Sequence, residues 1–172
     1  MILTGELCTL RQAAIGDVAT IVEWENNTDH WLVSNTNSSY SEEEVKHFIE
    51  HENDIFINQQ MRLMIINGSN ESVGCIDLYD FDVNNKRVGI GILIDPAFRG
   101  KGFGIEALTI LCRFCFDHLD VCSIYADVLV NNFSSIRLFE SAGFQLNGTK
   151  KGWLWDGAEF IDQHFYQLFR SL

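Results

Sequence analysis

Long apolar runs are missing from this chain of 172 residues. No segment is long enough to span a bilayer, and no apolar run follows a basic start as it would in a secretory signal. Basic residues are scarce too, since 12 Lys and Arg stand against 24 Asp and Glu and give a formal net charge of −12. This balance opposes binding to nucleic acid or to an anionic membrane, and it is compatible with a cationic substrate. We therefore expect a cytoplasmic protein that binds neither nucleic acid nor membranes.

Metal-binding patterns are missing as well. The five histidines show no ligand spacing. The pair Cys112-x-x-Cys115 has no second ligand pair, and it lies in an apolar helical pattern that predicts packing in the core. The count of five cysteines is odd and accompanies no secretion signal, so we expect reduced thiols. The sequence thus predicts no metal site.

The chain reads as one folding unit, without a repeat, a linker or a low-complexity tract, so residues 1–172 are predicted to form a single domain. Asp17 is the expected N-cap of a first helix, Ser41-x-x-Glu44 is a capping box, and Asp156-Gly157 marks a hairpin. Hydrophobic periodicity predicts strands at 3–10, 61–66, 73–81, 87–94, 124–130, 153–155 and 160–169, and helices at 18–24, 42–49, 105–118 and 134–141. This order predicts an α/β fold with a mixed sheet and helices on both of its faces.

A glycine-rich loop, Arg99-Gly100-Lys101-Gly102-Phe103-Gly104, lies between an expected strand and an expected helix. This arrangement presents free backbone N–H groups to an anion, and the helix dipole adds partial positive charge. Three nucleotide-type ligands are possible. No Gly-Lys is followed by Ser or Thr, which excludes a P-loop. The spacing is not that of a dinucleotide fingerprint either, although Asp127 lies at a suitable distance downstream for a ribose contact.

The third possibility rests on two motifs. Arg99-x-x-Gly102-x-Gly104 is similar to the loop that binds the pyrophosphate of coenzyme A in the GNAT superfamily of N-acetyltransferases. The segment 131–144, a strand end with Asn followed by a short helix that ends in Gly-Phe, resembles the second signature of that superfamily. Leu10-Arg11 and Gly16-Asp17 also resemble its ribosomal-protein and polyamine branch. The resemblance implies a mostly antiparallel, twisted sheet, acetyl-CoA as cofactor and a homo-oligomer.

The resemblance also implies the roles of individual residues. The loop would hold the pyrophosphate, the central strand would pair with the pantetheine arm, and Asn132 would contact the cofactor. Phe139 stands where many members have a Tyr that acts as general acid, so water or the hydroxyl of Ser135 is expected to protonate the departing thiolate. The expected cofactor-binding residues are Ile92, Leu93, Ile94, Arg99, Gly100, Lys101, Gly102, Phe103, Gly104, Asn132 and Phe139.

On the acceptor side, Asp77 matches a family carboxylate that acts as general base. Its alternatives are a solvent-facing position on the strand or a pairing with an Arg such as Arg62 or Arg87. The second family carboxylate is missing, because the chain has Gly89 there. Trp31 and Tyr79 are expected to line the acceptor site, whereas Glu25 is expected on a solvated helix face.

The reaction that these features imply is transfer of acetyl from acetyl-CoA to a primary amine by direct attack in a ternary complex. A polyamine such as spermidine or spermine is the leading acceptor. The alternatives are the N-terminal amine of a protein, as in ribosomal-protein acetyltransferases, and a non-catalytic CoA-binding sensor. A dinucleotide-dependent oxidoreductase is the least favoured hypothesis.

Overall fold

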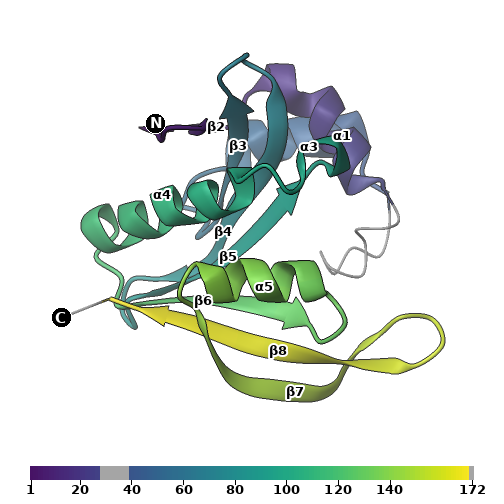
Figure 1. The fold of residues 1–172 in the computed structure, drawn as a ribbon. Coiled ribbons are helices and arrows are strands. Elements are labelled where there is room, and N and C mark those ends of the chain that lie inside the picture. The colour runs from purple at the N-terminus through teal and green to yellow at the C-terminus, as the bar shows by residue number, and fades with distance from the viewer. Residues whose placement is uncertain (28–38, 171–172) are drawn as a thin grey trace.

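The computed structural model describes residues 1–27 and 39–170 (Figure 1). One sheet of eight strands runs through the molecule in the order β1-β2-β3-β4-β5-β6-β8-β7. Its neighbouring strands are antiparallel except for the parallel pair β5 and β6. The elements are β1 (Ile2–Thr4), β2 (Cys8–Gln12), η1 (Ile15–Asp17), α1 (Val18–Glu25), α3 (Glu42–His47), η2 (Phe48–Glu52), β3 (Met61–Asn67), β4 (Ser72–Asp82), β5 (Arg87–Ile94), η3 (Pro96–Phe98), α4 (Phe103–His118), β6 (Ser123–Leu129), α5 (Phe133–Ser141), β7 (Gln145–Trp155) and β8 (Phe160–Phe169).

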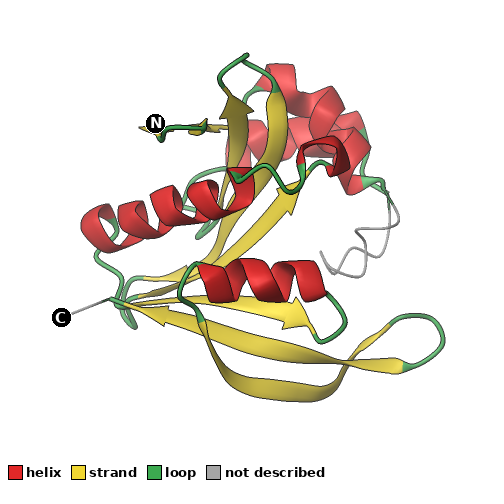
Figure 2. Ribbon diagram, viewed as in Figure 1, coloured by secondary structure: helices red, strands yellow, loops and turns green. Residues whose placement is uncertain are grey.

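The helices cover both faces of this sheet, as the sequence predicts (Figure 2). Alternate residues of the central strands, such as Ile76, Ile90 and Ile124, pack with α4 and α5 in the larger core cluster. The intervening residues of β3 and β4, such as Met64 and Cys75, pack with α1 and α3 in a second cluster. Because side chains alternate along a strand, each residue's position assigns it to one of the two faces. We call the face toward α1 and α3 the α1 face.

The pairing between β5 and β6 is short. Only Arg87, Val88 and Gly89 of β5 have partners on β6, and the last pair joins Gly89 to Tyr125. Beyond that pair the two strands diverge, as the arrows in Figure 1 show. Between residues 90 and 94, β5 remains paired with β4 alone among the described strands. One edge of the central strand is therefore open.

The structure corrects several sequence-based boundaries. The expected strand at 3–10 is two strands, β1 and β2, separated by a turn at residues 5–7. Asp17 stands at the N-cap position of α1, but its side chain makes no capping bond and instead accepts hydrogen bonds from the Ala14 amide and from Arg11. Helix α3 starts at the capping box of Ser41 and Glu44, as expected, and then widens into the π-helical turn η2. Strand β7 begins eight residues before the expected Trp153.

Candidate functional site

The glycine loop joins β5 to α4 at the end of the sheet where β5 and β6 have separated. Gly100 and Gly102 have φ angles of +74° and +89°, which a residue with a Cβ rarely adopts. Within the described parts of the chain, the amides of residues 100–105 donate no hydrogen bond, and the first helical bond runs from the Glu106 amide to the Gly102 carbonyl. The loop therefore presents a row of unpaired N–H groups at the positive end of a 16-residue helix.

The two basic side chains of the loop fold back onto the segment before it. Arg99 donates through Nε to the Ile94 carbonyl at 3.0 Å, and Lys101 donates to the Ala97 carbonyl at 2.9 Å. The ammonium group of Lys101 also lies 5.0 Å from the centre of the Phe98 ring. Both basic side chains thus bond to the segment that precedes the loop, and they add full positive charge to the loop that contains the unpaired amides.

Glu106, one turn into α4, is a residue that the sequence analysis missed. Its carboxylate accepts hydrogen bonds from the backbone amides of Glu6, Leu7 and Cys8, at 2.7–3.0 Å. Although burial opposes the charged form, these N–H donors lower the pKa of Glu106. The contact fastens the start of α4 to the β1–β2 turn. No local pattern announces it, because the partners lie about a hundred residues apart in sequence.

Helix α5 begins at the same end of the sheet, after β6. Asn132 caps it by accepting a hydrogen bond from the Ser135 amide at 3.2 Å and another from the Ser134 hydroxyl at 2.9 Å. The two helices approach closely, because a Cβ on Gly104 would lie 3.3 Å from Leu138. Contact of Asn132 with the cofactor stays a prediction, and so does proton donation by the half-buried Ser135.

Phe139 lies inside the core. Its side chain is 4% exposed, and its ring meets that of Phe144 edge-to-face with 5.1 Å between centroids. The packing accounts for an aromatic residue at this position without any role in proton transfer. Its contact with the cofactor remains a prediction.

An ion cluster occupies the α1 face of β3 and β4. Asp77 stands directly opposite Arg62 in the strand register and accepts two hydrogen bonds from it, at 2.7 and 2.8 Å. Glu25, at the end of α1, pairs with the same guanidinium at 2.6 Å. The pairing of Asp77 with Arg62 is one of the alternatives that the sequence left open, and its role as base stays a prediction. The expectation for Glu25 was wrong, since its side chain is only 16% exposed and belongs to this cluster.

An aromatic row continues along the α1 face. The Tyr79 ring lies over Gly89, where a Cβ would come within 2.2 Å of it, so the ring occupies the space of the missing family carboxylate. The Tyr79 ring meets Tyr125 edge-to-face at 5.7 Å, and Tyr125 packs against Phe165 at 5.6 Å. Burial is the main cause that raises the pKa of Tyr79. This row lies at the point where β5 and β6 separate.

Two polar contacts border the row. Lys150 donates to both carboxylate oxygens of Asp127 at 2.7 and 2.8 Å, and its ammonium group lies 5.2 Å from the Trp153 ring centre. At the other side, the indole of Trp24 donates to Asp95 at 3.1 Å, which connects α1 to the residue that directly follows β5. The first contact joins β7 to β6, and the second joins α1 to the end of β5, so both hold together elements around the α1 face.

Trp31 lies outside the described residues. The two ends of the segment that contains it are held together by Asn26, whose side chain exchanges two hydrogen bonds with the backbone of Tyr40 at 2.7 and 2.8 Å. The thiols of Cys112 and Cys115 are unbonded and buried, which confirms their packing role, and burial raises the pKa of Cys112 to about 12. Residues 1–27 and 39–170 contain no group of three side chains suited to a metal ion. The helices in these ranges are too short or too polar to cross a membrane.

The open edge, the glycine loop and the order of elements coincide with a known family. The model of the acetyltransferase (GNAT) domain matches residues 8–145, so the chain belongs to this family and is an acetyl-CoA-dependent N-acetyltransferase. The unpaired amides of the loop and the open edge of β5 fit the pyrophosphate and the amide-containing pantetheine arm of that cofactor.

Individual relatives agree with the family. The chain is 28% identical over 163 residues to an uncharacterized SPbeta prophage-derived N-acetyltransferase of Bacillus subtilis, covering 91% of this chain and 90% of that one. It is 36% identical over 76 residues to the spermine/spermidine N(1)-acetyltransferase of the same organism, covering 44% and 50%. In fold it is similar to a spermidine N-acetyltransferase from Vibrio cholerae in complex with CoA and spermine, with a TM-score of 0.87, 22% identity and 96% of both chains covered.

Proposed function

We propose that this N-acetyltransferase acetylates the primary amine of a small cationic acceptor, with polyamines such as spermidine and spermine as the leading class. The observation that carries the proposal is the arrangement of two surfaces around the split between β5 and β6. An anion-binding loop lies at the open end of the split, and a face of carboxylates and aromatic rings lies beside its closed end.

Acetyl-CoA supplies an acetyl thioester, and the chain supplies its position. We assign the pyrophosphate to the amides of the glycine loop, with Arg99 and Lys101 as charge partners. The open edge of Ile92, Leu93 and Ile94 would take the pantetheine arm as an added strand. An unpaired backbone N–H of β5 near the closed end would then donate to the oxygen that becomes negative during attack.

The acceptor side supports a cation. Four carboxylates gather on or beside the α1 face, namely Glu25, Asp77, Asp80 and Asp127, against the two basic side chains of Arg62 and Lys150. Aromatic rings between them suit alkyl chains and ammonium groups. We retain Asp77 as a candidate for the base and Ser135 as a candidate proton donor to the thiolate. Tyr79 and Trp31 remain candidates for acceptor contacts.

A homo-oligomer is part of the same proposal. Trp153, Trp155 and Phe160 expose 55–65% of their surface around the β7–β8 hairpin, on the edge strand β7 and its partner. Exposed aromatic side chains on a sheet edge are typical of interaction surfaces. Light scattering coupled to gel filtration measures the mass directly.

Release of CoA thiol from acetyl-CoA tests the function. The acceptors are spermidine, spermine, putrescine, lysine, an aminoglycoside and peptides with basic N-termini, each measured against a blank without amine. Selective release with the polyamines supports the proposal. Selective release with peptides would favour acetylation of a protein N-terminus. Binding of acetyl-CoA by calorimetry without release on any amine would instead indicate a CoA-binding sensor.

A further inference from the structure

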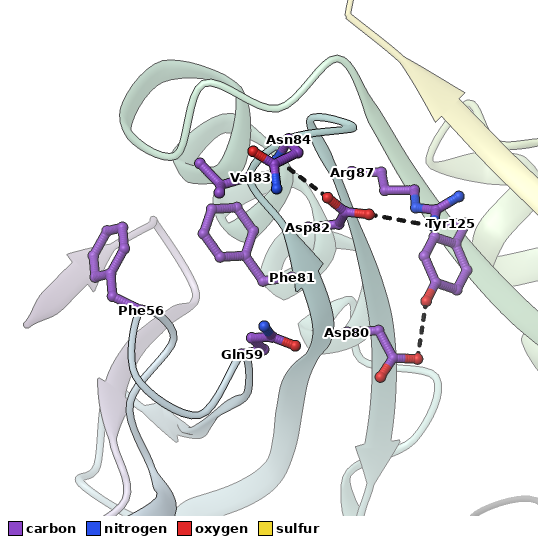
Figure 3. Close-up of a pocket in the computed structure, with 9 residues that line it drawn as sticks. All are labelled: Phe56, Gln59, Asp80, Phe81, Asp82, Val83, Asn84, Arg87 and Tyr125. Carbon is purple, nitrogen blue, oxygen red and sulfur yellow. Dashed lines mark hydrogen bonds and ion pairs between the residues drawn. The ribbon is translucent and has the colours of Figure 1, made fainter.

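A pocket of about 560 Å³ lies where β4 ends and β5 begins (Figure 3), whereas the glycine loop follows the other end of β5. It is bounded by Asp80 and Asp82 at the end of β4, Arg87 at the start of β5 and Tyr125 on β6. The rings of Phe56 and Phe81 complete its wall. Among these residues, only Asp80, as one of the carboxylates of the acceptor side, and Tyr125, as a member of the aromatic row, have entered the account so far.

Asp80 differs from the other acidic residue of the pocket in its hydrogen bonds. Asp82 accepts bonds from the amides of Asn84 and Asn85, from the Asn85 side chain and from Arg87, so both of its oxygens are occupied. Asp80 accepts one bond at Oδ2, from the Tyr125 hydroxyl at 3.2 Å. Its Oδ1 accepts none within the described chain, and Asp80 is one of the residues that line the pocket (Figure 3). A free carboxylate oxygen is thus available to a ligand.

The backbone conformation at Asp80 sets the direction of its side chain. Its φ of +50° lies in the left-handed region, and the β4–β5 register shifts between Tyr79 and Asp82. A bulge of this kind redirects a side chain that would otherwise follow the alternation of the strand. Here it turns the carboxylate toward Tyr125, whose partner Gly89 forms the last pair before β5 and β6 separate.

We propose that Asp80 is the carboxylate that accepts the proton of the acceptor amine, and that Tyr125 positions it at the closed end of the split. The inference rests on the proposed function and names the base for that site. Asp77 is less suited, because both of its oxygens already accept bonds from Arg62. The charged and titratable groups around Asp80 are Tyr79 and Asp82 on β4, Arg87 on β5, and Tyr125 and Asp127 on β6.

The proton balance is simple. An ammonium group of the acceptor transfers one proton to Oδ1 of Asp80, which later releases it to solvent. The neutral amine nitrogen attacks the thioester carbon, a C–N bond forms, and the C–S bond breaks. The second proton of the nitrogen passes to the departing sulfur. Burial is the main cause that raises the pKa of Tyr125, so its hydroxyl remains a donor to Oδ2 throughout.

Asp80→Asn is the informative variant, because Asn tolerates a positive φ and keeps the side-chain shape. With the amine that the wild type uses best, we expect kcat/KM at pH 7 to fall about 100-fold. The wild-type profile should be flat between about pH 6 and 9, whereas that of the variant should rise about tenfold per pH unit because only neutral amine reacts. Tyr125→Phe should also lower kcat/KM, and its pH profile should differ less from that of the wild type than the profile of Asp80→Asn does. Asp117→Asn, on the exposed side of α4, is the matched control.

A binding measurement gives a readout independent of turnover. Calorimetric titration of the same amine without acetyl-CoA should show affinity about tenfold lower for Asp80→Asn than for the wild type and for Asp117→Asn. A wild-type profile and affinity in Asp80→Asn would overturn the assignment while leaving the proposed function intact. Absence of release by the wild type with every amine would overturn the proposed function and this assignment together.

Discussion

The ring of Tyr79 occupies the place that a side chain at Gly89 would need. The two residues are partners across β4 and β5, and a Cβ on Gly89 would lie 2.2 Å from Cε2 of Tyr79. Any residue with a side chain at position 89 therefore requires the Tyr79 ring to move. The ring and a side chain at position 89 thus exclude each other from the same space.

This exclusion predicts a strong coupling between the two positions. Gly89→Ala should lower the stability by about 1–3 kcal/mol, because the Tyr79 ring must move. In a Tyr79→Ala background the same substitution should have little effect, since the space is then free. Thermal unfolding of the four proteins of this cycle measures the coupling. An equal loss in both backgrounds would show that the ring does not fill the site of the Gly89 side chain.

Stability should depend on the charge of Glu106. The folded-state pKa of this carboxyl is lowered by its N–H donors in spite of burial, so its contribution is present above the unfolded pKa and is lost as pH falls through the folded pKa. We expect Glu106→Gln to lose about 2 kcal/mol at pH 7 and much less near pH 3. Urea unfolding at both pH values measures this, with the exposed Glu23→Gln as control. A loss that is the same at both pH values would contradict the charge-based account.

The glycines of the loop should differ in their sensitivity to a methyl group. Gly100→Ala and Gly102→Ala both place a Cβ at positive φ, at a cost of about 1–2 kcal/mol each. Only at Gly102 would the Cβ also meet Leu7, at 3.0 Å. Gly102→Ala should therefore weaken acetyl-CoA binding by at least tenfold, measured by calorimetry, and exceed the effect of Gly100→Ala. The reverse ranking would argue against the contact between the loop and the β1–β2 turn.

Arg62 should matter for folding whatever base the reaction uses. Arg62→Met leaves Asp77 and Glu25 half-buried without their shared cation, which should cost about 3–5 kcal/mol. For a chain of this length that corresponds to a fall in Tm of roughly 10 °C. Arg113→Met, on the exposed side of α4, provides the comparison and should melt within a few degrees of the wild type. Similar melting of both variants would show that the cluster contributes little.

Local signals predicted most of the fold. The strands β3 to β6, the helices α4 and α5, and the capping box of Ser41 and Glu44 carry their own periodicity and caps, so short windows of sequence are enough to find them. The glycine loop was found for the same reason. Strand β7 was underestimated because it is an edge strand that is mostly exposed, so alternation of apolar and polar residues is weak.

What the sequence did not predict depends on distant partners. The β1–β2 turn is held by Glu106, and Glu25 is withdrawn from solvent by Arg62, a residue of another element. Neither contact is marked in the sequence by a periodic pattern or by a motif. The bulge at Asp80 was also missed, since nothing in Asp77-Leu78-Tyr79-Asp80 indicates that the last residue adopts a positive φ.

The order of strands has a consequence for synthesis of the chain. Strand β8 separates β6 from β7, so β6 has only its three pairs with β5 until residues 160–169 arrive to pair along its other side. Folding during translation can complete the half of the sheet from β1 to β5 early, but the second wall of the split must wait for β8. A ribosome-bound chain that ends before residue 160 would carry the glycine loop and β6, but β6 would lack the strand that pairs along its far side.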